Sequence, residues 1–291
     1  MTENPLVAII VLNYNGEDCL QGALHSLSAL PYEPKKIIIV DNDSEDFSFE
    51  KAKKGFPACI FIKNKANLGF AAGMNVGIRE AFRLGVKYIW LFNNDARADR
   101  ASLAELVSFC ERNGDAGAVS PVITDFQGNQ WFSGGKISYS RMRAYHRVDD
   151  ARKKSDIPYQ SEYLSGCALF LPSAVLREGG LLDERYFLYY EDADLSLRIR
   201  KSGKKLFVLP TARVAHGEQS EKKSSEKIYY LVLSGLLFFR EHTPPHLRPF
   251  VWAFSRLRRF KNFLDVLLGR EKAAMVARAY KEYDRTQHTD S

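Results

Sequence analysis

Short apolar runs that end in polar residues recur along the first hundred positions of the chain. Four of these runs indicate buried strands, at Val7 to Tyr14, Lys36 to Asn42, Cys59 to Asn64 and Tyr88 to Phe92. Helical patterns accompany them at Glu17 to Leu30, Ala72 to Leu84 and Leu103 to Asn113. Strands that alternate with helices predict an α/β fold built around a mostly parallel sheet.

The pattern changes after about residue 117. Segments typical of strands and hairpins follow at Ala116 to Ile123, Gln130 to Ser138 and Tyr163 to Pro172. A charged loop is expected from Arg147 to Ser155, then an acidic cluster that opens a short helix, and then a strand from Lys205 to His216. Three helical stretches follow from about residue 224. We therefore expect a domain over 1–223, with halves at about 1–116 and 117–223, and a helical tail over 224–291.

Polar segments follow three of the predicted strands, and each contains an asparagine. They are NYNG, DNDSED and NNDA. In parallel α/β sheets ligands bind beyond the carboxyl ends of the strands, so these segments are expected to form one site. Asn, Asp and Gly also favour ordinary turns. Three such segments in succession favour the shared site over the turn interpretation.

Phosphate-binding glycine motifs are missing from this edge. The first strand–helix turn lacks G-x-G-x-x-G, and no G-x-x-x-x-G-K-[ST] occurs, which disfavours dehydrogenases and P-loop enzymes. A carboxylate-held metal could bind phosphate instead, and Asp95 is the leading ligand because Mg²⁺ often takes one or two carboxylates plus substrate oxygens. The alternative is that Asp95 caps the helix that starts near Ala101, although Asp99 is better placed for that.

A second acidic cluster consists of Glu191, Asp192 and Asp194. Their mutual repulsion predicts a raised pKa for at least one carboxyl, which suits a general base that takes a proton from a hydroxyl. Acidic residues are also favoured in the first turn of a helix by its dipole. Arg198 or Arg200 could then simply pair with Asp194, and both explanations stay open at this point.

Two further features permit both a functional and a structural explanation. Gly69, Gly73 and Gly77 are spaced four apart, which lets either a ligand or a neighbouring backbone approach the helix closely. His216 ends a predicted strand and is a candidate metal ligand or phosphate donor, whereas a lone histidine is more often structural.

Positive charge is concentrated at the end of the chain. The 42 Lys and Arg exceed the 35 Asp and Glu by +7, and the segment from 240 to 291 alone has 11 basic against 6 acidic residues, a surplus of +5. Aromatic and basic residues mix in this segment, which predicts contact of 246–268 with an anionic membrane surface. Packing against the first domain, or a homodimer contact, would explain the pattern as well. No nucleic-acid-recognition motif accompanies the charge.

Targeting and redox signals are few. The four cysteines include no CxxC pair, so neither a zinc site nor a disulfide framework is indicated. The N-terminus lacks the pattern of a signal peptide, and no apolar run reaches the ~18 residues that suggest a spanning helix. We expect a cytoplasmic protein that is peripheral on the inner face of the cell membrane.

Five segments together resemble the family 2 glycosyltransferases, and within them the rhamnosyltransferase-like branch. They are VAIIVLNYNG, IIIVDNDSED, NLGFAAGMNVGI, LFNNDA and LLDERYFLYYEDADLSLRIRKSGKKL, in the order and spacing of the family over about residues 6–220. The resemblance implies a GT-A fold, a Rossmann-like mostly parallel sheet flanked by helices. It also implies inverting transfer of a sugar from a UDP- or dTDP-linked donor, with a divalent Mg or Mn ion as cofactor.

The resemblance also implies roles for individual residues. The donor-site residues are Asn13, Tyr14, Asp41, Asn67, Gly69, Asn93 and Asn94, with Asp41 hydrogen-bonded to the base. The metal ligands are Asp95 and His216. Asp192 is the expected base, Glu191 assists it, and Gly166 and Asp194 lie on the acceptor side. The acceptor is expected to be a saccharide or lipid-linked sugar in cell-surface polysaccharide synthesis, and rhamnose as the donor sugar is favoured by resemblance only.

Two departures from the family pattern affect this interpretation. Asn93 replaces the first carboxylate of the Asp-x-Asp metal motif, which predicts weak affinity for free metal. The Gln-x-x-Arg-Trp motif of processive synthases is absent, which favours transfer of a single sugar per encounter. Two alternatives remain: a non-catalytic nucleotide-sugar-binding scaffold and a sugar nucleotidyltransferase.

Overall fold

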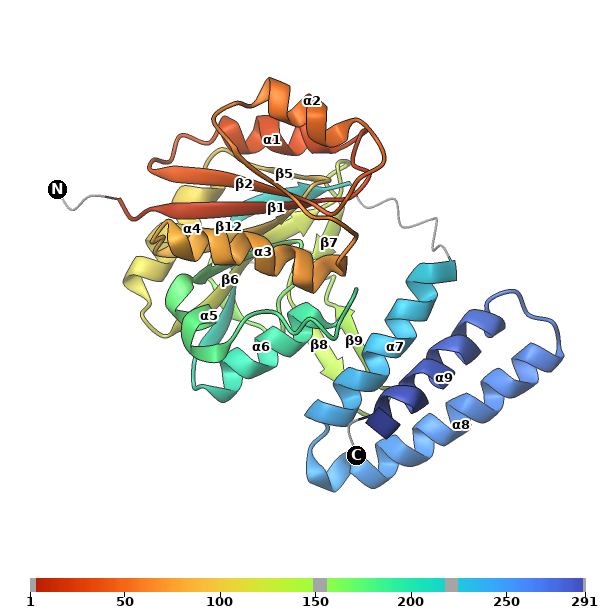
Figure 1. Cartoon of the computed structure of the whole chain (residues 1–291). Helices are drawn as coiled ribbons and strands as arrows, with labels where there is room; N and C mark the ends of the chain where they lie inside the picture. The colour runs from red at the N-terminus through yellow and green to blue at the C-terminus, as the bar shows by residue number, and fades with distance from the viewer. Residues whose placement is uncertain (1–3, 149–155, 218–224, 290–291) are drawn as a thin grey trace.

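The computed structural model describes residues 4–148, 156–217 and 225–289 of the chain. A central sheet lies between layers of helices, and three C-terminal helices stand beside this body (Figure 1). The expected loop from Arg147 to Ser155 falls largely outside the described residues.

The sheet has the strand order β3-β2-β1-β4-β11-β6-β12-β10. Its strands are β1 (Val7–Asn13), β2 (Lys35–Asp41), β3 (Ile60–Lys63), β4 (Tyr88–Asn93), β6 (Ala116–Thr124), β10 (Tyr159–Gln160), β11 (Ala168–Pro172) and β12 (Lys205–His216). β11 is antiparallel to both β4 and β6, so β6 and β12 run in the same direction as the first four strands. This arrangement confirms the predicted α/β fold with a mostly parallel sheet.

Shorter strands complete this half of the molecule. β5 (Ala96–Ala98) pairs with β12, β7 (Gln130–Phe132) pairs with β6, and β8 (Gly135–Ser138) forms a separate hairpin with β9 (Arg143–His146). The β8–β9 hairpin lies at the end of the body that faces the C-terminal helices (Figure 1). The hairpin therefore lies between the sheet domain and the C-terminal helices.

Six helices flank the sheet: α1 (Leu20–Ser28), α2 (Ser48–Gly55), α3 (Gly69–Arg83), α4 (Ser102–Arg112), α5 (Ser173–Gly179) and α6 (Glu191–Lys201). α1 and α2 lie on one side of β1 and β2, and α3 lies on the other (Figure 1). The strands between them are largely buried apart from Lys35 and Lys36 at the start of β2, as their continuous Ile and Val content predicts.

Close packing accounts for the glycine spacing of α3. A Cβ atom on Gly73 would lie 2.6 Å from Leu12, and one on Gly77 would lie 2.4 Å from Ile10. These two glycines therefore let the helix approach the sheet, which is the structural explanation of the pattern. Gly69 differs, because its φ of +80° and a Cβ position 2.4 Å from the Phe187 carbonyl oxygen both require glycine.

The tail forms three helices, α7 (Ser225–His242), α8 (Arg248–Leu267) and α9 (Ala273–Thr289), with a 3₁₀ turn, η2 (Pro245–Leu247), between the first two. α7 packs beside the segment that leads into α6, where the Ser234 hydroxyl donates a 2.8 Å hydrogen bond to the Leu188 carbonyl. Arg185 and Glu241 form an ion pair of 2.7 Å at the same contact. Within the described ranges, no helix is long and apolar enough to cross a bilayer.

Candidate active site

Buried amides join the carboxyl ends of β1, β2 and β4. The Asn13 side chain is fully buried, and its amide nitrogen donates to Asp41 Oδ1 (2.9 Å), Ser44 Oγ (3.1 Å) and Ser48 Oγ (2.8 Å). The Asn94 amide in turn donates to Asn13 Oδ1 at 3.0 Å. The structure thus brings the three polar segments together at one edge. Asp41 fixes the loop here, and its contact with a nucleotide base stays a prediction.

The loop before α3 closes one side of this edge. Asn67 Oδ1 accepts hydrogen bonds from the Gly69 amide (2.9 Å) and the Asn42 side chain (3.3 Å). Tyr14 follows β1 and leaves 48% of its surface exposed, so its ring is accessible at the same edge. The exposed tyrosine and the ordered loop suit a planar, polar ligand.

Asp95 and His216 meet beside the end of β4. The antiparallel pairing of β5 with β12 sets Ala96 opposite His216, which places the imidazole next to the preceding Asp95. His216 Nε2 lies 3.0 Å from Asp95 Oδ1 and 3.3 Å from Asn93 Nδ2. Burial lowers the pKa of His216, but Cys167 and Asp95 raise it by more, to about 11.

Two buried atoms of this pair have no hydrogen-bond partner in the part of the chain that the structure describes. They are Asp95 Oδ1, which pairs with His216 Nε2 as an ion pair only, and His216 Nδ1. The carboxylate oxygen suits Mg²⁺ and Mn²⁺, and the imidazole nitrogen is a ligand of divalent metals once it has lost its proton. The residues present therefore fit a divalent ion, and Asp95 is in a strand-end turn rather than at the start of α4.

Asp192 lies in the first turn of α6, after Tyr189 and Tyr190, which both have left-handed backbones with φ of 70°. Its Oδ2 accepts a 2.9 Å hydrogen bond from the Gly166 amide, and its Oδ1 accepts one of 2.7 Å from the Ala193 amide. Burial raises the pKa of Asp192, although these amides act in the opposite direction. A carboxylate held by two amides is a well-oriented proton acceptor.

Glu191 is buried beside Asp192. Burial raises the pKa of Glu191 well above its usual range, and the charges of Asp192 and Asp194 raise it further. Its Oε2 is buried and forms no hydrogen bond with any described residue. The cluster thus combines an oriented carboxylate with a carboxyl that favours its neutral, hydrogen-donating form.

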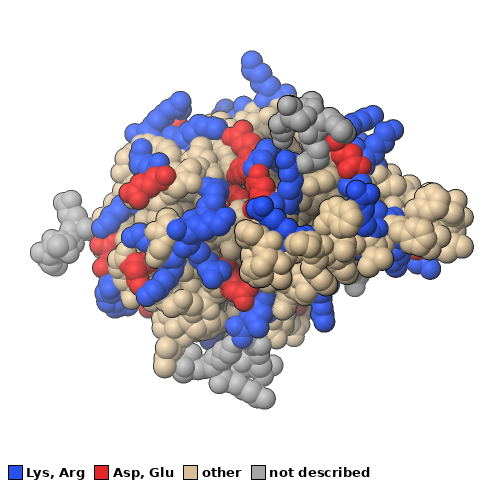
Figure 2. Space-filling view, turned by 90° about the horizontal axis from the view of Figure 1, so that it is seen from below, with Lys and Arg blue, Asp and Glu red and all other residues tan. Residues whose placement is uncertain are grey.

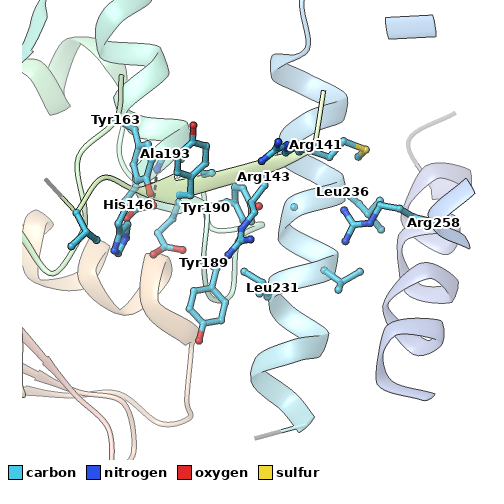
Figure 3. Close-up of a pocket in the computed structure, with 18 of the residues that line it drawn as sticks. Arg141, Arg143, His146, Tyr163, Tyr189, Tyr190, Ala193, Leu231, Leu236 and Arg258 are labelled. Atoms are coloured by element: carbon cyan, nitrogen blue, oxygen red, sulfur yellow. Dashed lines mark hydrogen bonds between the residues drawn. The ribbon is translucent and has the colours of Figure 1, made fainter. Parts of the chain in front are cut away.

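A cavity of 740 Å³ opens at these two carboxyls. Its walls come from β7, β9, the start of α6, α7 and α8, and they include Trp131. Figure 3 shows Tyr163, Tyr189 and Tyr190 in the same walls. The Trp131 ring packs against His216 at 4.6 Å between centroids, so the cavity adjoins the Asp95–His216 pair. An oriented carboxylate, a metal-compatible pair and a cavity with aromatic walls therefore lie side by side.

Comparison with known proteins identifies this arrangement. Residues 8–175 match the family model described as glycosyl transferase family 2. The chain belongs to glycosyl transferase family 2. It is therefore a glycosyltransferase, which disfavours the scaffold and nucleotidyltransferase alternatives.

Relatives of the glycosyltransferase support the rhamnosyltransferase-like branch. The chain is 26% identical to the N-acetylglucosaminyl-diphospho-decaprenol L-rhamnosyltransferase of Mycobacterium tuberculosis, over 72% of this chain and 76% of the relative. It is 24% identical to the dTDP-rhamnosyl transferase RfbF of Shigella flexneri, over 84% of this chain and 83% of that one.

Solved structures confirm the GT-A fold. GalNAc-T7, solved with UDP, GalNAc and Mn²⁺, aligns with a TM-score of 0.64 at 17% identity, over 80% of this chain. The alignment spans about half of GalNAc-T7, 48% of its length. The mannosyltransferase PcManGT of Pyrobaculum calidifontis, solved with GDP-Man and Mn²⁺, aligns with a TM-score of 0.61 at 16% identity, over 98% of this chain and 76% of that one.

One expected acceptor-side residue of the glycosyltransferase requires correction. Asp194 is only 2% exposed and does not line the cavity. Its carboxylate pairs with Arg198 Nε (2.8 Å) and His242 Nε2 (2.6 Å), which ties α6 to α7. The structural alternative, pairing with Arg198, is what the structure shows. Gly166, by contrast, does contact Asp192, and a Cβ there would lie 3.5 Å from the Asp192 Cβ.

Asp194 also belongs to a group of three potential metal ligands, with Glu241 and His242. Arginine side chains already supply the positive charge there, because Arg198 pairs with Asp194 and Arg185 with Glu241. A cation would have to displace these ion pairs. The strand-end pair of Asp95 and His216 is the better-suited metal site.

Sequence reasoning missed most of the cavity wall of the glycosyltransferase. Trp131, Tyr163, Tyr189 and Tyr190 line the cavity, and none was singled out beforehand. Tyr189 and Tyr190, directly before the acidic cluster, were the one local sequence feature that could have indicated this wall. The contribution of the β8–β9 hairpin depends on tertiary packing.

Proposed function

We propose that this glycosyltransferase transfers one sugar from a nucleotide-diphosphate donor to an acceptor hydroxyl with inversion at the anomeric carbon. The observation that carries the proposal is Asp192, a half-buried carboxylate that is held by two amides and lines an open cavity. Inversion requires one base and no covalent nucleophile. The oxygen of the acceptor hydroxyl bonds to the anomeric carbon while the bond from that carbon to the nucleoside diphosphate breaks. Asp192 takes the proton that the hydroxyl releases.

The stereochemistry of the product tests this proposal directly. Proton NMR of the product from an anomerically pure donor should show the opposite anomeric configuration. The expected inversion is checked early in the reaction, before any slow equilibration of released sugar. A product that retains the donor configuration would contradict the role of Asp192 as base.

The donor site that we propose lies over the carboxyl ends of β1, β2 and β4, within residues 1–116. Tyr14, Asn67 and Gly69 border the nucleotide, while Asn13 and Asp41 hold the loops through the hydrogen bonds that join β1 to β2. Asn93 and Asn94 lie next to the diphosphate. Rhamnose on dTDP or UDP is the proposed donor, supported by the names of two relatives.

Asp95 and His216 would hold the proposed divalent ion, Mg²⁺ or Mn²⁺. When bound there, the ion would offset the negative charge that develops on the leaving diphosphate. The chain itself orients the two ligands through the β5–β12 pairing, and the packing of Trp131 on His216 shields the imidazole from water. Glu191, in its neutral form, donates a hydrogen bond toward the acceptor or the sugar.

The acceptor site that we propose is formed by residues 117–223 together with the tail, 224–291. On α8 a broad face remains uncovered, and five of its apolar side chains are each more than half exposed: Trp252, Leu257, Phe260, Phe263 and Leu267. Figure 2 shows an uncharged strip on the right, at the place of α8 in Figure 1, with Lys and Arg around it. We assign this face to an anionic membrane surface, where a lipid-linked acceptor would be found.

Membrane docking is tested by sedimentation with liposomes that contain anionic lipid. The intact protein should bind at low salt, and a variant with Phe260→Ala, Phe263→Ala and Leu267→Ala should bind at least about tenfold more weakly, since each of these side chains would lose its burial in lipid. Phe47→Ala is the matched control, because Phe47 is 70% exposed but lies before α2. No binding by the intact protein would refute the docking, and a concentration-dependent dimer would assign the face to a second copy.

A further inference from the structure

Three arginines line the cavity at the side where it meets the C-terminal helices. Arg141 lies in the turn between β8 and β9, Arg143 begins β9, and Arg258 comes from α8. Figure 3 shows them around the part of the cavity that α7 borders with Leu231 and Leu236. We call them the arginine triad. None of the three forms a side-chain hydrogen bond or ion pair with another described residue, and all three are exposed.

The positive charge of the triad is not balanced by the acidic side chains of the same cavity. Its carboxyls are Glu191, whose neutral form burial favours, and Asp192, whose single negative charge does not offset three guanidinium groups. Asp192 moreover directs its two oxygens to the Gly166 and Ala193 amides. Three guanidinium groups that line one cavity and form no hydrogen bond or ion pair with the described residues are suited to an anion with several oxygens, such as a phosphate or diphosphate.

Apolar side chains line the same part of the cavity as the triad. Leu231, Val232 and Leu236 of α7 line it, and Figure 3 shows Leu231 and Leu236 between Arg143 and Arg258. The cavity therefore combines carboxyls, arginines and an apolar helix face. This combination matches an amphiphilic ligand that has a sugar, a phosphate group and a hydrocarbon chain.

The donor diphosphate does not account for the triad. The proposed donor residues Asn13, Asp41 and Asp95 belong to the strand ends, and none of them lines the cavity that the triad faces. The triad instead lies between Asp192 and the uncovered face of α8. An anion bound there belongs to the acceptor rather than to the donor.

We propose that the arginine triad binds the diphosphate of an isoprenoid-diphosphate-linked sugar, whose sugar reaches Asp192 while its hydrocarbon chain follows α7 toward α8. This inference rests on the proposed transferase function and adds the residues that recognise the acceptor. Two walls of the cavity must supply the site, because Arg141 and Arg143 come from a hairpin and Arg258 from α8.

The test uses farnesyl diphosphate as the probe, below its micelle concentration, with the full chain and isothermal titration calorimetry. Each of Arg141→Gln, Arg143→Gln and Arg258→Gln should raise the Kd by about tenfold or more, as expected for a lost charge-assisted hydrogen bond. Farnesol should bind the wild type more weakly than farnesyl diphosphate does. Arg112→Gln is the matched control, since Arg112 is exposed at the far end of α4 and should leave the Kd unchanged.

Three further measurements separate the sources of the anion. The Kd for dTDP and UDP, and sedimentation with anionic liposomes, should be the same in the triad variants as in the wild type. A loss confined to nucleotide binding would assign the triad to the donor, and a loss confined to liposome binding would assign it to phospholipid headgroups. Equal affinity of wild type and triple variant for farnesyl diphosphate, or no binding at all, overturns the proposal. The Asp192→Asn variant should still bind farnesyl diphosphate. Binding by the triad is therefore measured independently of whether Asp192 is the base.

Discussion

Replacement of Asp192 by asparagine is expected to lower kcat by about 10²- to 10⁴-fold, the range typical of a lost general base. The asparagine side-chain oxygen can still accept the hydrogen bond from the Gly166 amide, so the start of α6 should keep its position. The thermal midpoint and the Kd for the nucleotide should therefore change little. Initial rates at saturating donor and acceptor, together with thermal unfolding, measure these effects.

A matched control and a pH profile sharpen this result. Asp115→Asn removes only an exposed ion pair with Lys205 and should leave kcat unaltered. Because burial raises the pKa of Asp192 and only the ionised form accepts a proton, wild-type activity should fall as the pH drops through that raised pKa. Full activity in Asp192→Asn, with the acid limb of the profile intact, would remove Asp192 from the mechanism.

Removal of the metal site is expected to have the second large effect. A nucleoside diphosphate at 100 times its Kd should stabilise the wild type by about 2.7 kcal/mol, which a thermal-shift assay resolves. UDP, dTDP and GDP are each tested with Mn²⁺, Mg²⁺ or EDTA. The stabilisation by the preferred nucleotide should vanish with EDTA and in Asp95→Ala, and kcat should fall on the order of 10³-fold, because several kcal/mol of charge stabilisation are lost.

Asp99→Ala is the control for this experiment, because Asp99 is exposed four positions away, in the turn between β5 and α4. It should bind the nucleotide and metal as the wild type does. Stabilisation that persists in EDTA would show that the donor binds without metal and would refute the role of Asp95 and His216. No shift with any nucleotide would mean that the strand ends do not form a donor site.

The strand ends were predictable because each one marks a change from apolar to polar residues. Val7–Asn13 is buried almost throughout and β2 is buried from Ile37 onward, so their continuous apolar runs alone indicate buried strands. α2 was missed because just three of its residues, Ser48, Phe49 and Ala52, are buried, which gives a weak helical pattern. The reversed direction of β11 was also missed, since side-chain patterns do not encode whether neighbouring strands run together or opposed.

Contacts between residues that are far apart in the sequence could not be predicted and were found only in the structure. Asp95 and His216 could each be suspected, but their contact follows from the pairing of β5 with β12. Asp194 carried the same acidic signature as its neighbours and points instead to α7. The sequence pattern of α8 indicated an amphipathic helix. Tertiary packing decides which side of that helix faces the cavity, so the sequence did not predict it.

The cavity is shared between two stretches of the chain that can change separately in evolution. The segment matched by the family model ends at residue 175, whereas much of the cavity wall opposite Asp192 comes from α7 and α8, which begin at Ser225 and Arg248. A gene that exchanged its 3′ end with a relative would keep the strand ends and replace that wall. Such recombination could redirect an existing sugar donor to a new surface glycan, and chimeric enzymes offer the same route to altered acceptor choice.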